Sequence, residues 1–267
     1  MRLTVLALMT ALAAPAAAQA QAQPPLATRT GLSMQMPTPQ EDQALLAAVA
    51  STTRPEADRA RDIHRHPYES LTFWGLRPGL TVVEVQPGAG GWWTAILSPY
   101  AEATGGRYVA ANNLAALEGV EAGSADMVLI ARAFHNWARV SGRTDAVLAA
   151  AFKALKPGGI LAVEQHRAAD GLNVADTAPT GYVPEIYVIR AAEAAGFVLE
   201  ARSDLNANPA DDRDHPYGVW SLKPTRVSAP REGQAIDRPT PLTPEERAEL
   251  DAVGESDRMT LRFRRPE

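Results

Sequence analysis

Residues 80–93 read LTVVEVQPGAGGWW, and the fold is decided in this stretch. An apolar, β-branched run ends around Glu84, a glycine-rich turn follows, and residues 92–97 can begin a helix. A buried strand, a tight glycine turn and a helix N-terminus form the nucleotide-binding opening of an open α/β sheet. The glycines let the backbone approach a ligand closely, and the Glu84 carboxylate can accept hydrogen bonds from ribose-type hydroxyls. A strand, turn and helix that bind nothing give the same pattern, so both interpretations stay open at this point.

Strands and helices alternate along the rest of the chain. Further strands are predicted over 107–111, 126–131, 160–164 and 197–201, and helices over 39–49, 55–64, 145–155 and 184–195. The run 126–131 is almost wholly apolar, as expected of a strand that is buried on both faces. The alternation predicts an α/β fold with a Rossmann-like, doubly wound and mostly parallel sheet, covered by helices on both faces.

The C-terminal part departs from that alternation. Residues 206–257 form a long irregular insertion before the last strand. One short helix is predicted inside it, because Thr243, Pro244 and Glu246 fit a capping box with proline at the first helical position. Residues 259–263 alternate between apolar and polar, which predicts a last strand at an edge of the sheet.

Composition narrows the function classes. The chain has 267 residues, of which 46% are hydrophobic and 21% charged, enough for one good-sized core. Its net charge of -5 gives no electrostatic basis for a nucleic-acid partner. With no cysteine, the chain has no disulfide, no thiolate nucleophile and no cysteine-ligated metal.

The N-terminal segment has the pattern of a secretory signal. A single arginine precedes the apolar run 3–14, and small-residue cleavage sites follow. A membrane anchor is the alternative, but the run is too short to span a bilayer. We therefore expect a signal peptide over 1–22, a linker and N-terminal helix over 23–54, and a single domain over 55–267. The mature protein is expected to be periplasmic or secreted, without a stable membrane anchor.

Polar side chains gather where the predicted strands end. They fall at 84–91, Asn112 and Asn113, 132–137, 164–167 and 204–214. In a parallel sheet these carboxyl ends share one edge, and ligands bind there. The sequence therefore predicts a site at that edge.

Three of these segments together resemble class I S-adenosylmethionine-dependent methyltransferases. They are VEVQPGAGG at 83–91, FHNW at 134–137 and LKPGG at 155–159. More narrowly, the chain resembles a group of exported predicted methyltransferases, whose pattern also matches RHP at 65–67, EQHR at 164–167 (one residue longer here), NPAD at 208–211 and GESDRMTL at 254–261. The resemblance runs from about residue 55 to the end, and it implies the class I fold with an antiparallel last strand.

The resemblance also implies site residues. The cofactor S-adenosylmethionine would be lined by Glu84, Gln86, Gly88, Gly90, Asn112, Asn113, Ala133 and Phe134. Among these, Asn112 or Asn113 would stand at the adenosine ribose, and Ala133 and Phe134 would flank the cofactor. His135, Asn136 and Trp137 would face the substrate.

The sequence departs from the family pattern in three places. Gln86 replaces the first glycine of the turn and Pro87 follows it, so the turn is stiffer and bulkier. Asn113 stands where an acid usually holds the ribose, which loses a charge-assisted hydrogen bond of about 1 kcal/mol. Residues 113–126 are too few for a full helix, strand and loop, so we expect the third strand of that fold to be reduced or missing.

Four residues are candidates for the chemistry. His135 could act as a general base because imidazole titrates near neutral pH, or it could be a structural hydrogen-bonded histidine. Asn136 would shape the pocket. Glu164 and His166 alternate along a strand and so point the same way. No metal site is predicted, since His135, Glu164 and His166 lack a ligand spacing signature.

Three further features have two interpretations each. Trp92 and Trp93 could stack on a ligand, although residues that open a helix against a sheet are more often core. Arg65 and His66 could cover the pocket, or form a charge pair at a helix C-terminus. Residues 211–215 could be a solvated loop or the rim of the substrate site.

The predicted function is an exported S-adenosylmethionine-dependent methyltransferase for an unidentified small-molecule, lipid or protein acceptor. Methyl transfer is a direct displacement, so alignment and exclusion of water are the main tasks, and a base is needed only if the acceptor must lose a proton. The alternative is a non-catalytic periplasmic binding or scaffolding protein on the same fold. Gln86, Asn113, the short segment 113–126 and the cytosolic origin of the cofactor motivate that alternative.

Overall fold

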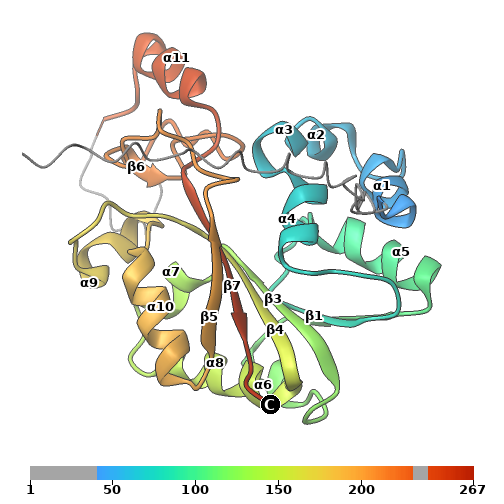
Figure 1. Ribbon diagram of the computed structural model, residues 1–267. Helices are drawn as coiled ribbons and strands as arrows, with labels where there is room; N and C mark the ends of the chain where they lie inside the picture. The colour runs from blue at the N-terminus through green and yellow to red at the C-terminus, as the bar shows by residue number, and fades with distance from the viewer. Residues whose placement is uncertain (1–40, 231–239) are drawn as a thin grey trace, which may run out of the picture. The chain divides into compact units, whose positions relative to one another are not determined.

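The computed structural model describes residues 41–230 and 240–267. The predicted signal peptide (1–22) and most of the predicted linker lie outside the described residues, as does part of the insertion. Figure 1 shows a central sheet with helices on both faces. In the described part of the chain, no helix has the length and apolar composition needed to cross a membrane.

Six strands form one sheet in the order β2-β1-β3-β4-β7-β5. Their bounds are β1 (Thr81–Val85), β2 (Arg107–Ala111), β3 (Ala125–Ala131), β4 (Leu155–His166), β5 (Val198–Ser203) and β7 (Arg258–Arg264). Strands β1 to β4 pair in parallel, and β7 is antiparallel to both of its neighbours. The predicted α/β class, the mostly parallel sheet and the antiparallel last strand are confirmed.

The expected edge position of the last strand is wrong. β7 lies inside the sheet, between β4 and β5. Two of its polar residues, Arg258 and Thr260, are buried among polar partners, which the alternating pattern does not reveal. Thr260 accepts a hydrogen bond from Asn206 at 3.0 Å, and Arg258 pairs with Glu164 at 3.1 Å.

Among residues 41–230 and 240–267, the sheet has no counterpart of the third strand expected of the class I methyltransferase fold, which the short segment 113–126 predicted to be reduced or missing. β2 pairs with β1 on one side and has no strand on the other. A single short helix, α6 (Leu114–Glu118), separates it from β3. The sheet therefore ends at β2 with an open edge.

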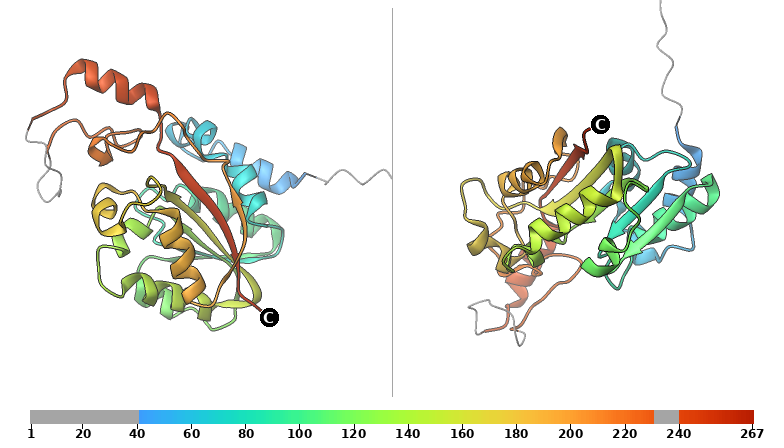
Figure 2. Two further views of the ribbon diagram at one scale, coloured as in Figure 1. Left: turned by 60° about the vertical axis from the view of Figure 1, so that its left-hand side comes forward. Right: turned by 90° about the horizontal axis from the view of Figure 1, so that it is seen from below.

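Helices cover both faces of the sheet. Successive side chains of β3 point to opposite faces, and on each face they pack against a different set of helices. Val128 and Ile130 pack against α6, α8 (Arg143–Ala154) and α10 (Glu185–Ala194). Met127 and Leu129 pack on the opposite face with α1 (Gln43–Ala50), α4 (Pro67–Phe73) and α5 (Thr94–Thr104). The two views of Figure 2 show these layers on either side of the strands.

Short elements gather around the carboxyl ends of β1, β3 and β4. The helix predicted over 55–64 is two short helices, α2 (Glu56–Arg59) and α3 (Asp62–Arg65). The insertion carries β6 (Pro216–Val219), which lies outside the sheet, and α11 (Pro244–Val253) with the predicted capping box. The remaining short helices are α7 (Phe134–Trp137), α9 (Val174–Thr177) and the 3-10 turn Ala178–Thr180. Figure 1 places α3 and β6 above this edge of the sheet.

Candidate active site

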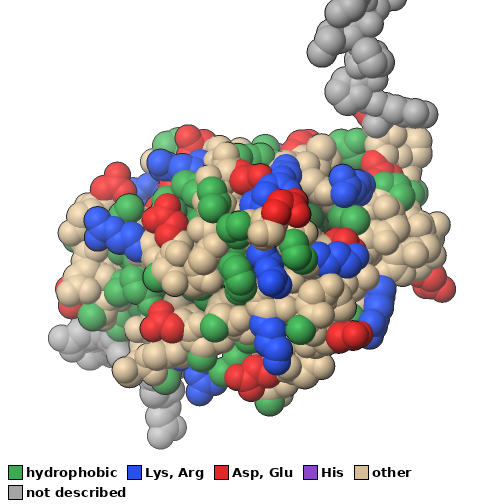
Figure 3. All heavy atoms as spheres, turned by 60° about the horizontal axis from the view of Figure 1, so that its bottom comes forward, with side chains coloured by type: hydrophobic (Ala, Val, Ile, Leu, Met, Phe, Trp, Pro, Cys, Tyr) green, Lys and Arg blue, Asp and Glu red, His purple; other side chains and the backbone are tan. Residues whose placement is uncertain are grey.

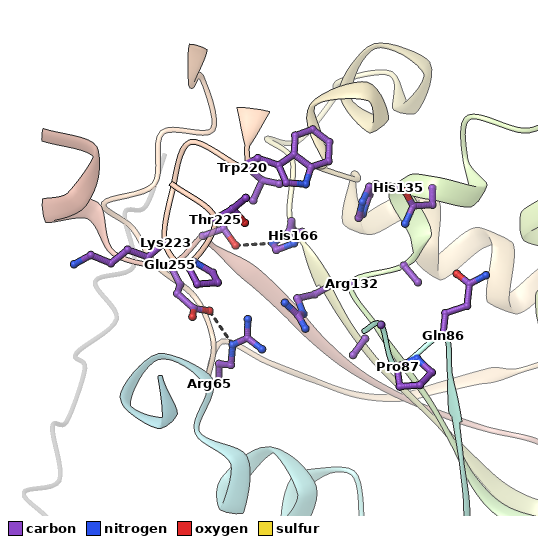
Figure 4. Close-up of a pocket in the computed structure, with 17 residues that line it drawn as sticks. Arg65, Gln86, Pro87, Arg132, His135, His166, Trp220, Lys223, Thr225 and Glu255 are labelled. Carbon is purple, nitrogen blue, oxygen red and sulfur yellow. Dashed lines mark hydrogen bonds and ion pairs between the residues drawn. The ribbon is translucent and has the colours of Figure 1, made fainter. Parts of the chain in front are cut away.

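A cavity of about 270 Å³ opens at the carboxyl ends of β1, β3 and β4. One wall is the glycine turn (86–88), another is the end of β3 with the start of α7 (131–136), and His166 comes from the end of β4. Arg65 at the end of α3, residues 219–220 and 223–225 of the insertion, and residues 255–256 before β7 complete it (Figure 4). The cavity therefore lies at the edge of the sheet where the sequence predicts a site.

The structure divides the predicted site residues into two groups. Six of them line this cavity: Gln86, Gly88, Ala133, His135, Asn136 and His166. Six do not: Glu84, Gly90, Asn112, Asn113, Phe134 and Glu164. The group inside the cavity comes from the turn, from α7 and from the end of β4, whereas the other group is buried or lies on the surface.

The glycine turn has free space at Gly88, whereas the side chain of Gln86 is held in a hydrogen bond. Gly88 has a φ of +73°, and a Cβ built there would meet nothing within 4 Å. Gln86 also has a positive φ, +50°, which is unusual for a residue with a side chain. Its Oε1 accepts a hydrogen bond from Trp137 Nε1 at 3.0 Å. The side chain of Gln86 thus fastens the turn to α7, and Gly88 leaves free space beside the cavity.

Glu84 has its partners inside the protein. Its carboxylate is 2% exposed and accepts hydrogen bonds from Thr94 Oγ1 at 2.9 Å and from Tyr108 OH at 2.7 Å. Burial raises the pKa of Glu84, although both hydroxyls stabilise the charged form. The group predicted to meet a ribose instead joins β1, α5 and β2.

The predicted ribose residues lie at the open edge of the sheet. Asn112 and Asn113 are exposed. Asn113 Oδ1 accepts the backbone N–H of Ala116 at 2.8 Å and so caps α6. Phe134 and Trp137 are in the core, with ring centroids 5.2 Å apart.

Two histidines meet in the cavity. The rings of His135 and His166 have centroids 6.1 Å apart. Burial, helped by the charge of Arg139, lowers the pKa of His135 to about 4. Burial also lowers the pKa of His166 well below its usual value, and its Nδ1 lies 2.6 Å from Ser256 Oγ. Both rings are neutral at pH 7, so they serve as hydrogen-bonding groups and as weak bases.

An arginine cluster lies beside the histidines, and sequence reasoning did not identify it as one. We use this name for Arg61, Arg65, Arg132 and Arg258 with the carboxylates of Glu164 and Glu255. Glu255 accepts hydrogen bonds from Arg61, Arg65 and Arg258 at 2.6, 2.9 and 2.8 Å. Burial opposes its ionisation, but the three arginines outweigh that effect and lower its pKa to about 2. Glu164 is fully buried between Arg258 and Trp93, outside the cavity.

Arg132 is the exceptional member of the cluster. It directly follows β3 with a φ of +57°. Within residues 41–230 and 240–267 its guanidinium has no carboxylate at ion-pair distance, and its Nε is buried without a hydrogen-bond partner. Burial lowers its pKa. Its position at a strand end was the available sequence signal, but nothing in the sequence shows that its charge is unmatched.

Three earlier alternatives are now decided. Trp92 and Trp93 are core residues, 4% and 1% exposed, in contact at a centroid distance of 4.7 Å. Arg65 is 1% exposed and held by Glu255, so it forms a wall rather than a lid. In the segment 211–215, Asp212 is exposed like a solvated loop.

Asp211 of the same segment is buried. Among the described residues, one group of side chains is close enough together to hold a metal ion, namely Asp211, Asp212 and His215. Asp211 already accepts hydrogen bonds from Tyr182 and from the backbone N–H of Asp257. This group is therefore explained as part of the fold, and it does not line the cavity.

Comparison with known proteins identifies solved structures that are similar to this chain. No family model matches the chain, and no curated protein does. Solved structures of S-adenosylmethionine-dependent methyltransferases from Aquifex aeolicus and Mesorhizobium loti are similar to it, with 18% and 16% identity and TM-scores of 0.43 and 0.37. These likenesses cover 55% and 74% of this chain, and 88% and 96% of those chains.

The [4+2]-cyclase SpnF is similar as well, with 18% identity, a TM-score of 0.43, and coverage of 78% of this chain and 80% of that one. Likenesses this distant carry no argument about activity, and proteins of one fold can perform different reactions. The chemistry of this chain has to be argued from its own cavity.

Proposed function

We propose that this chain is an S-adenosylmethionine-dependent methyltransferase whose active site is the cavity at the ends of β1, β3 and β4. One observation carries the proposal. The turn at 86–88 and the segment 133–136, which the resemblance assigns to cofactor and acceptor, line the same cavity together with His166. A site of this kind at the carboxyl edge of a parallel sheet is where α/β enzymes bind their ligands.

The residues of the site suit the methionine part of S-adenosylmethionine better than its ribose. Gly88 leaves open space, so the backbone of the turn and Ala133 would hold the methionine part. On the ribose side, the hydrogen bonds of Glu84 are already made and Asn113 caps α6. The adenosine would therefore lie along the open edge at β2, with fewer polar contacts than the family pattern implies.

The residues of the chain would position the acceptor and exclude water. Bound S-adenosylmethionine supplies an electrophilic methyl group. Because the pKa of His135 is about 4, this imidazole would accept a proton only weakly at neutral pH. An acceptor that arrives already deprotonated fits this site best. His166, held by Ser256, and Asn136 would then orient it.

The proposal is tested by isothermal titration of the full chain with S-adenosylhomocysteine. The variant Gly88→Asn places a side chain in the cavity, and Gly105→Asn is its control. Both glycines have φ near +70° and free space around a new Cβ, and asparagine tolerates this conformation. We expect binding by the wild type and by Gly105→Asn, and at least tenfold weaker binding by Gly88→Asn. No heat from the wild type at millimolar ligand would contradict the proposal and favour a binding or scaffolding protein.

We propose export as a second part of the function, on the signal-like composition of residues 1–22. Expression with a C-terminal epitope followed by N-terminal sequencing of the periplasmic fraction tests it. Cleavage within the small-residue sites near residue 20 is the expected outcome. A full-length chain in the cytosol would contradict export without affecting the proposed enzymatic activity.

A further inference from the structure

The arginine cluster has more positive than negative charge. Glu255 is shared by Arg61, Arg65 and Arg258, and Glu164 pairs with Arg258. Arg61 also approaches Asp58, at 3.6 Å. Even with Asp58 counted, Arg132 is left without an opposite charge. Its side chain is partly exposed at the cavity, but its Nε is buried, and a buried polar group without a partner is unfavourable.

Several charged side chains away from the cavity form ion pairs with carboxylates. On the opposite edge of the sheet, Lys156 pairs with Asp126 at 2.6 Å and Arg262 with Glu200 at 2.9 Å. Figure 3 shows cationic and anionic side chains interspersed over the face that includes the bottom of Figure 1. Arg132 differs from these residues because it lines the cavity and has no ion-pair partner among the described residues.

The guanidinium groups of Arg65 and Arg132 both face the cavity. Figure 4 shows Arg132 and Arg65 reaching toward the middle of the cavity from different walls. Arg65 is 1% exposed and gives its Nε to Glu255, but its Nη1 is buried without a hydrogen-bond partner. Arg132 lines the same cavity, and its Nε is likewise buried without a hydrogen-bond partner. The N–H groups of arginine match the planar or tetrahedral oxygens of carboxylate and phosphate.

The backbone of Arg132 has an unusual conformation that is fixed by a hydrogen bond to β4. Its φ of +57° is costly for a residue with a Cβ. The backbone N–H of Arg132 donates to the carbonyl of Glu164 at 2.7 Å, which locks the turn after β3. Local strain of this kind concentrates at functional sites, where it positions a group in advance of binding.

We propose that the cavity binds an acceptor that carries an oxyanion, a carboxylate or a phosphate, paired with Arg132 and Arg65. Calling this anion the acceptor rests on the proposed methyltransferase function, whereas the oxyanion site itself rests on the geometry alone. The positive sulfonium of S-adenosylmethionine is repelled by guanidinium groups, so the arginines suit the other reactant. In Figure 4, Arg65 lies on the far side of Arg132 from Pro87, which leaves the turn for the cofactor.

The first test measures binding of inorganic phosphate and acetate to the full chain by isothermal titration. Arg132→Met keeps the bulk and removes the charge, and Arg143→Met, on the exposed start of α8, is the control. We expect at least about a tenfold loss of affinity for Arg132→Met and no change for Arg143→Met. Arg132→Met should also raise the melting temperature of the anion-free protein, because it removes an unmatched charge. Absence of anion binding by the wild type, or equal binding by Arg132→Met, would overturn the proposal.

The second test separates the acceptor from the cofactor. S-adenosylhomocysteine and 5′-methylthioadenosine share the adenosine and the thioether, but only the first has a carboxylate. We expect Arg132→Met to bind both as the wild type does. A loss for S-adenosylhomocysteine alone would show that the arginines hold the cofactor's own carboxylate, and would overturn the assignment to the acceptor. Phosphate binding without any S-adenosylhomocysteine binding would keep the oxyanion site and refute the methyltransferase function.

Discussion

The two halves of the sheet edge use polar residues in opposite ways. At β1 and β2, Glu84 and Asn113 are satisfied by Thr94, Tyr108 and the backbone of α6. At β3 and β4, Arg132 has an unpaired Nε and, among the described residues, no carboxylate at ion-pair distance, although Glu255 also lines the cavity. A polar side chain at a strand end is thus no guide to binding until its partners are known. The half with unmatched groups is the half that has capacity for a ligand.

The largest expected effect concerns the carboxylate that holds the arginine half together. Glu255→Gln leaves Arg61, Arg65 and Arg258 without their shared partner, and we expect a loss of about 3 to 5 kcal/mol in the free energy of unfolding. Urea denaturation measures it. Asp251→Asn is the control, because Asp251 forms an ion pair with Arg226 at the surface and should cost less than about 1 kcal/mol. Equal losses in the two variants would mean that the cluster is not a buried unit.

The next effect is the pH dependence of stability. An unfolded histidine takes up a proton near pH 6.5, whereas folded His135 does so only near pH 4. Stability should therefore fall as the pH decreases from about 6.5 to about 4, by up to about 3 kcal/mol from this group. In His135→Asn that part of the slope should disappear in urea denaturation across the same range. An unchanged slope would mean that the His135 imidazole is not shielded from water in the folded protein.

A smaller effect on stability is expected from substitution of Glu84 in β1. Glu84→Gln removes one hydrogen-bond acceptor between Thr94 and Tyr108, at a cost of about 1 to 2 kcal/mol in stability. Because Glu84 does not line the cavity, the affinity for S-adenosylhomocysteine should stay within about twofold of the wild type. Unchanged stability together with tenfold weaker binding would show that Glu84 contacts the cofactor. It would contradict the assignment of Glu84 to the structural half of the sheet edge.

The smallest effect compares two helix caps. Asn113 caps α6 and Asn173 caps α9, each through its side-chain oxygen. We expect Asn113→Ala and Asn173→Ala each to cost about 1 kcal/mol in stability, and neither to alter the affinity for S-adenosylhomocysteine. Weaker cofactor binding in Asn113→Ala alone would show that Asn113 contacts the ribose, as the resemblance implies.

Much of the fold could be predicted because it depends on local patterns. The apolar run at β3, the glycine turn after β1 and the short segment 113–126 determine the parallel sheet and its missing strand. The cavity at the carboxyl edge follows from the parallel arrangement itself.

The rest depends on contacts between residues far apart in the chain. Arg65 and Glu255 are 190 positions apart, and Trp93 and Glu164 are 71 apart. Alternation shows which side chains share a face of a strand, but it does not show which polar group has found a partner. That is why β7 looked like an edge strand, and why Glu84 looked like a ligand-binding acid while Arg132 passed unnoticed.

A crystal structure of the protein with both S-adenosylhomocysteine and phosphate tests the central claim most directly. We predict the thioether between the turn at 86–88 and the segment 133–136, with phosphate on Arg132 and Arg65 in the same cavity. Either ligand bound at another place on the molecule, or a cavity that contains neither at saturating concentration, would contradict it.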